Sequence, residues 1–76
     1  MLKVEDRVLT SSHDLGTQYR DKFMVFQYLD EDDYMDPGYL LYICDTRDEA
    51  FEVSREVRKT LDNICVIEGN DWWTVL

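Results

Sequence analysis

The stretch that decides the fold is residues 46–61, TRDEAFEVSREVRKTL, which has the pattern of one amphipathic helix. Glu49 stands three residues after Thr46, the spacing of a capping box. Acidic residues gather in the first turn and basic residues in the last, which suits the helix dipole. Asp62-Asn63 is expected to end the helix. The apolar residues at helical spacing predict one buried stripe, formed by Ala50, Val53, Val57 and Leu61.

Apolar segments rich in β-branched and aromatic residues stand on both sides of this helix and predict strands. Gly69-Asn70 predicts a two-residue hairpin turn of type II′ near the end of the chain. That register sets Glu68 opposite Asp71, although facing like charges are unfavourable. The expected strands are residues 22–29 and 39–44 before the helix and residues 63–68 and 71–76 after it.

The N-terminal part of the chain has weaker signals. Residues 2–9 alternate and predict a strand, but Val4 and Val8 also fit a helical spacing. Residues 10–21 are polar and predict a turn around Asp14-Leu15-Gly16. The 76 residues therefore predict one α+β domain with a four- or five-stranded, mainly antiparallel sheet and one α-helix packed on one face, in the order β-β-β-α-β-β.

A single helix covers only one face of a sheet, yet both faces of this sheet are expected to be apolar. Trp72 and Trp73 are neighbours in a strand and should point to opposite faces. Strand 22–29 likewise has two apolar sets, Phe23, Val25 and Leu29 on one side and Met24, Phe26 and Tyr28 on the other. The second face needs a cover, and the N-terminal segment, a second copy of the chain and a different partner are the open alternatives.

The charge of the chain limits its partners. Seventeen acidic and eight basic residues give a net charge of −9, which argues against direct binding of nucleic acid or an anionic membrane. A basic protein partner is compatible with this charge, and so is the simple alternative that acidity maintains solubility. The charged N-terminus and the lack of a long apolar run predict a cytoplasmic protein without a membrane span.

An acidic loop is expected over residues 30–38, closed by a type II turn at Pro37-Gly38. It could dock a basic partner or mimic nucleic-acid phosphates, with neighbouring tyrosines as anchors. A calcium site is a weaker alternative because Met35 stands where such a loop needs glycine. The loop could also be a solvated hairpin that deters aggregation. Its carboxylates are Asp30, Glu31, Asp32, Asp33 and Asp36.

Two further aromatic residues complete the predicted partner-binding set. Phe51 lies about 100° from the apolar stripe of the helix, so it either packs at the sheet edge or anchors a partner. Trp73 belongs to the aromatic set that needs a cover. The full set of predicted contact residues is Asp30, Glu31, Asp32, Asp33, Tyr34, Asp36, Phe51 and Trp73.

Catalytic and metal-binding patterns are weak in this chain. Residues 11–14 contain the letters of a serine-hydrolase triad, but neighbours in sequence do not converge as a triad must. Cys44, Cys65 and His13 match no zinc-ligand spacing, and the two thiols are expected to be reduced and buried. The sequence therefore predicts a protein that is not an enzyme and that holds no metal or cofactor.

The leading hypothesis is a non-enzymatic protein-interaction module, an acidic inhibitor or mimic that blocks a basic, nucleic-acid-binding partner. Small acidic inhibitors carried by bacteriophages have this general character, which is an analogy of type and not a motif. The alternative is a small structural or regulatory homodimer whose acidity serves solubility only.

Overall fold

The computed structural model describes the backbone of residues 1–6, 8–30 and 33–75, and the side-chain surroundings of residues 1–6, 8–29 and 37–72. The fold is α+β, as predicted, with six strands and two helices in the described residues. The elements are β1 (Leu2–Lys3), β2 (Leu9–Thr10), α1 (Ser12–Gln18), β3 (Phe23–Asp30), β4 (Asp33–Cys44), α2 (Arg47–Val57), β5 (Ile64–Glu68) and β6 (Asp71–Val75).

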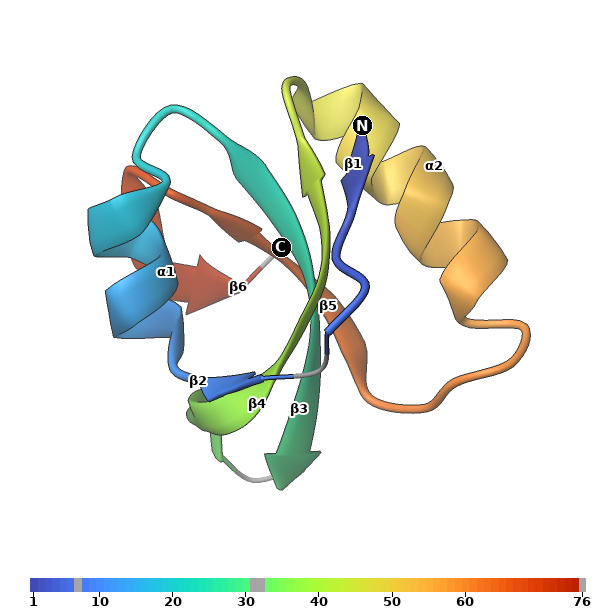
Figure 1. The fold of residues 1–76 in the computed structure, drawn as a ribbon, viewed down its shortest axis with the longest axis horizontal. Helices are drawn as coiled ribbons and strands as arrows, with labels where there is room; N and C mark the ends of the chain where they lie inside the picture. The colour runs from blue at the N-terminus through green and yellow to red at the C-terminus, as the bar shows by residue number, and fades with distance from the viewer. Residues whose placement is uncertain (7, 31–32, 76) are drawn as a thin grey trace.

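All strands belong to one antiparallel sheet with the order β1-β4-β3-β5-β6, and β2 also pairs with β4. The segment predicted as one strand over residues 2–9 thus forms two short strands along the same edge of β4. Figure 1 shows α1 and α2 on opposite sides of this sheet, whereas the sequence predicted a single helix on one side. Neither helix in the described residues is long and apolar enough to cross a membrane.

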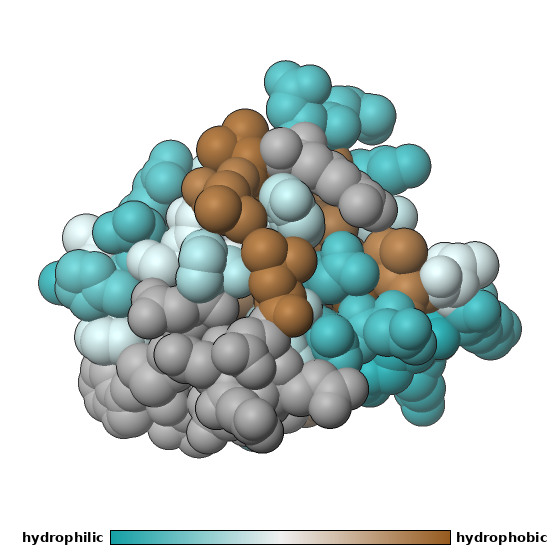
Figure 2. All heavy atoms as spheres, turned by 90° about the horizontal axis from the view of Figure 1, so that it is seen from below, coloured by the Kyte–Doolittle hydropathy of each residue, from teal (hydrophilic) through white to brown (hydrophobic). Residues whose placement is uncertain are grey.

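Apolar side chains reach the surface at the end of the sheet where β2 pairs with β4. Val8 is 65% exposed, and Leu9 and Leu29 are each 52% exposed. Figure 2 views the molecule from this end and shows hydrophobic surface beside hydrophilic surface. Met1 and Leu2, at the start of the chain, are the other large apolar residues that are exposed among the described residues.

The prediction of a turn over residues 10–21 is wrong, because helix α1 forms there. The Ser11 hydroxyl caps the helix by accepting a hydrogen bond from the Asp14 N–H at 3.2 Å. Leu15 and Gly16 are buried. A Cβ atom at Gly16 would lie 2.5 Å from the Trp72 side chain, so this glycine permits close packing of the helix on β6.

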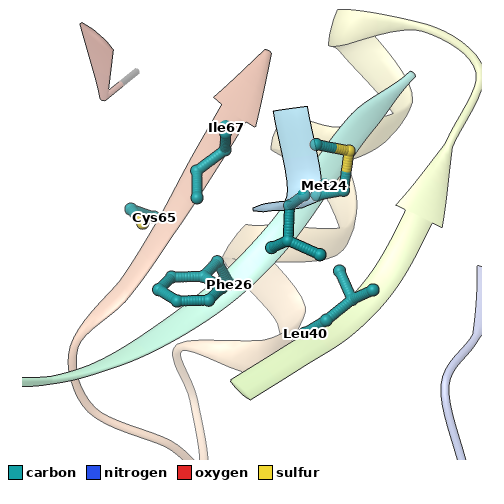
Figure 3. Packing of buried hydrophobic residues seen from close by; sticks show 6 residues of the cluster. Met24, Phe26, Leu40, Cys65 and Ile67 are labelled. Atoms are coloured by element: carbon teal, nitrogen blue, oxygen red, sulfur yellow. The ribbon is translucent and has the colours of Figure 1, made fainter. Parts of the chain in front are cut away.

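Each face of the sheet has its own core. Strand β3 alternates as predicted, with Met24 and Phe26 on the α1 side and Val25 on the α2 side, all 0% exposed. The α1-side core, seen in Figure 3, contains Leu15, Met24, Phe26, Leu40, Cys65 and Ile67. The α2-side core contains Val25, Leu41, Cys44, Ala50, Ile64 and Val66. The second face is therefore covered within the chain, by the N-terminal part that contains α1. Cover by the N-terminal segment was one of the three alternatives left open by the sequence.

Strand β4 departs from regular pairing in its middle. Val25 lies opposite Tyr42 and Phe26 lies opposite Leu40, so Leu41 is an extra residue in β4. Leu41 and Tyr42 consequently both belong to the α2 side. Residues 39–44 are apolar without alternation because β4 contributes side chains to the cores on both faces of the sheet.

The predicted bounds of the acidic loop, residues 30–38, and the predicted turn at Pro37-Gly38 are also wrong. Strand β4 begins at Asp33 and includes both Pro37 and Gly38. Gly38 lies opposite Tyr28 on one side and Thr10 on the other. A Cβ atom at this position would lie 2.3 Å from the Gln27 carbonyl oxygen and 2.5 Å from the Phe26 ring. Close packing of a buried aromatic ring, and not a turn, requires glycine here.

The last hairpin places Glu68 opposite Asp71, as predicted, but its register then shifts, so that Ile67 lies opposite Val75. The Glu68 carboxylate lies 3.4 Å from the Arg47 guanidinium, which offsets the unfavourable charge pair. Gly69 does not have a positive φ, so the predicted type II′ turn is wrong. This glycine is required because a Cβ atom would lie 1.9 Å from the Tyr19 carbonyl oxygen.

We expect Gly38→Ala to lower the free energy of unfolding by about 2 kcal/mol, because the added methyl displaces the buried Phe26 ring. Urea denaturation at 25 °C measures this change. Gln18→Ala, at an exposed position of α1, is the control and should change the free energy by less than about 0.5 kcal/mol. An unchanged urea midpoint for Gly38→Ala would contradict the packing described here.

Candidate functional site

Helix α2 rests on the sheet through small residues. Ala50 and Ser54 are both 0% exposed, and the Ser54 hydroxyl donates a hydrogen bond to the Phe51 carbonyl oxygen at 2.8 Å. The predicted buried stripe contained Val53, which is only half-buried. Ser54 occupies the centre of the contact in its place, and Val53 and Val57 lie at the flank that faces β4 and β1.

An open groove, here called the α2 groove, lies between this flank and the β1–β4 edge of the sheet. Its volume is about 450 Å³, and its lining residues are Met1, Tyr42, Glu49, Glu52, Val53, Glu56 and Val57. A second hollow of about 340 Å³ shares Tyr42 and Val57 with it and continues to Leu61. Apolar side chains line the floor of the α2 groove and carboxylates occupy the helix side of its rim, whereas the lining of the second hollow also includes Lys3, Glu5 and Thr60.

The carboxylates of the groove share one side of α2 because of their spacing. Glu49, Glu52 and Glu56 are three and four residues apart, which places them in one row. Glu49 Oε1 lies 2.8 Å from the Met1 α-amino nitrogen, and this contact raises the pKa of the amine. Glu56 pairs with Lys59 at 3.2 Å, and both side chains are well exposed. Glu52, between them, makes no ion pair with the described residues.

Two arginines, Arg47 in the first turn of α2 and Arg58 at its C-cap, lie toward the opposite flank. Arg47 pairs with Glu68 of β5, and Arg58 donates to the Ile64 carbonyl oxygen at 3.0 Å. Residues 47–59 are balanced in total charge, with four acidic and four basic residues, and the separation of the signs is partial because Lys59 lies beside Glu56. The i, i+3, i+7 spacing of the glutamates was present in the sequence, and it is the signal by which this site could have been found.

The structure brings together few of the predicted contact residues. Asp30 and Asp33 are backbone partners at the β3–β4 hairpin, so the acidic segment is a hairpin tip. Glu31 and Asp32 lie outside the described residues, as do the side chains of Asp30, Asp33, Tyr34, Asp36 and Trp73. The weaker calcium alternative falls on this same segment.

Phe51 is the one predicted contact residue whose side chain is described. It is partly buried and packs against the α2-side core, which is the packing alternative of the sequence analysis. By helical geometry it lies about 160° from Glu49 around α2, so it is not part of the α2 groove. Its role in partner binding stays a prediction.

The groups considered for catalysis have structural contacts. Asp14 Oδ1 lies 3.6 Å from His13 Nδ1. The His13 ring meets the Trp72 ring edge to face, with 4.8 Å between the ring centroids. Burial raises the pKa of Cys44 to about 11, with Glu49 adding to the effect, and burial raises that of Cys65 to about 12. Among the described residues, no three His, Cys, Asp or Glu side chains gather to hold a metal ion.

Comparison of the chain with protein-family models, curated proteins and solved structures finds no match. Function must therefore be inferred from the geometry of the chain itself. The α2 groove combines an apolar floor with a row of carboxylates, which resembles the apolar core and polar rim of a protein–protein interface.

We expect neither thiol to react with a disulfide reagent such as DTNB at pH 8 in the folded protein. Both pKa values lie well above that pH, and both side chains are buried. In 8 M urea, two thiols per chain should react within minutes. Rapid reaction of one thiol before unfolding would show that the core around it opens, and would contradict this prediction.

Proposed function

We propose that the protein is a non-enzymatic interaction module that binds a basic protein partner through the α2 groove. The observation that carries the proposal is the row of three glutamates beside the open apolar floor formed by Tyr42, Val53 and Val57. The net charge of −9 extends the same electrostatic field over the whole molecule.

The two parts of the groove have different roles in this proposal. Exposed ion pairs contribute only about 0–1 kcal/mol each, so the glutamates alone do not give stable binding. They raise the rate of encounter and select partners of positive charge. The apolar floor provides the area that is removed from water when the partner binds.

The acidic hairpin is a second contact surface in the same proposal, with Asp30, Glu31, Asp32, Asp33 and Asp36 as its carboxylates. A partner that binds nucleic acid through a basic surface would be blocked by such a contact, which makes the protein an inhibitor or phosphate mimic. We place this activity in the cytoplasm, since two reduced, buried thiols suit a reducing compartment.

A structural or regulatory homodimer is the second candidate function. The exposure of Val8, Leu9 and Leu29 near the β2 edge favours it, because a self-complementary apolar area can pair about a twofold axis. Acidity would then serve solubility only. Sedimentation at two concentrations separates the candidates, since the homodimer should change its mass with dilution and the interaction module should remain a monomer.

The interaction proposal predicts a defined pattern of capture from a lysate. The tagged protein should retain a basic partner at about 50 mM salt and release it at about 500 mM, where charges are screened within a few ångströms. The double variant Glu52→Gln and Glu56→Gln should lose most of this capture, measured by quantitative mass spectrometry.

The matched control removes two charges elsewhere, through Asp14→Asn and Asp21→Asn at exposed positions near α1. It should keep nearly full capture. Equal loss in both double variants would mean that total charge alone matters, and would overturn the assignment to the α2 groove. Replacing Asp30, Asp32, Asp33 and Asp36 by Asn tests the hairpin, and unchanged capture would remove it from the proposal.

A further inference from the structure

Helix α2 leaves part of its side of the sheet uncovered. It packs against β3, β4 and β5, while β1 lies beyond β4 at the edge of the sheet. A helix with its side chains is about 10 Å wide and strands are about 4.8 Å apart, so one helix covers little more than two strands. Figure 1 shows α2 alone on this side. The α2 groove lies where the side of this helix meets the part of the sheet that it does not cover.

The length of the groove suits a second helix bound beside α2. The two hollows share Tyr42 and Val57, and together they follow the chain from Glu49 to Leu61. Within α2 the lining runs from Glu49 to Val57, which is eight residues at 1.5 Å each or about 12 Å, and Thr60 and Leu61 extend it beyond the end of the helix. A helix laid beside α2 at the usual 8–10 Å between axes would complete the layer on this side of the sheet.

Resting on the proposed function, we propose that the α2 groove binds a cationic amphipathic helix of the partner protein. The apolar stripe of that helix lies on Tyr42, Val53 and Val57. Its lysine or arginine side chains, spaced three and four residues apart, face the glutamate row.

The contacts already made by the glutamates support cationic ligands. The α-amino group at Glu49 and Lys59 at Glu56 are both cations, and Glu52 between them has no ionic partner among the described residues. A second copy of this chain is a poor occupant if it docks through the same flank, since that would place one glutamate row against another. Charge complementarity thus favours a basic helix from a different protein.

The test uses the full ¹⁵N-labelled chain and an 18-residue peptide of leucine and lysine, arranged with leucine at helical spacing. The control peptide has the same composition in strict alternation, which does not form an amphipathic helix. We expect the helical peptide alone to shift the backbone amides of Tyr42, Val53 and Val57. Glu52→Lys should weaken its binding about five- to tenfold, whereas the matched charge reversal Asp21→Lys should change it less than about twofold.

Each other result overturns the inference in a recognisable way. Equal binding of both peptides, or shifts outside the groove, would reject the helical ligand but leave salt-dependent capture of a partner intact. Binding of neither peptide would reject it as well. Line broadening at the groove that grows with protein concentration, without peptide, would assign the groove to a second copy. Failure of capture together with specific binding of the helical peptide would reject the proposed function alone.

Discussion

Strand β3 buries side chains on both of its faces, and the arrangement of the other elements follows from the need to cover them. Met24 and Phe26 on one face and Val25 on the other are inaccessible to water. A chain of this size cannot leave either set exposed and remain stable, because its core is small. One helix on each side of the sheet is the result, and the shorter one, α1, reaches the sheet because Gly16 allows Trp72 to approach.

Elements with a local periodic pattern could be predicted from the sequence, and elements stabilised by distant contacts could not. The start of helix α2 at its Thr46 cap, the alternation of β3 and the Glu68–Asp71 pair follow from spacing. The end of α2 at Val57, before the expected Asp62-Asn63, and the register shift that sets Ile67 opposite Val75 do not. Helix α1 has seven residues and a glycine in its middle, so its packing on β4, β5 and β6 is what makes it stable. The sequence assigns Gly38 to a turn, because the contact that requires glycine there, with the Phe26 ring, comes from another strand.

The candidate site likewise combines features that local spacing predicts with features that depend on distant contacts. The charges of residues 47–59 sum to zero, and this balance does not reveal that the glutamates lie on one flank and Arg47 and Arg58 on the other. Their spacing contained this information, but the floor at Tyr42 depends on the bulge at Leu41, which no local pattern reveals. Because helices cover the core of both sheet faces, no whole bare sheet face is left for a partner, and only the strip of sheet beside α2 stays uncovered. The flank of α2 now provides the apolar contact.

A site of this size sets the kind of binding that can occur. A standard interface buries about 800 Å² on each partner, and a single helix on the flank of α2 would bury less. Exposed carboxylates add little free energy at equilibrium, but they steer a basic partner and accelerate its association. Binding should therefore be rapid, reversible and sensitive to salt. An inhibitor that must hold its target tightly would need a second contact in addition to the groove, and the acidic β3–β4 hairpin is the segment with the charge to provide it.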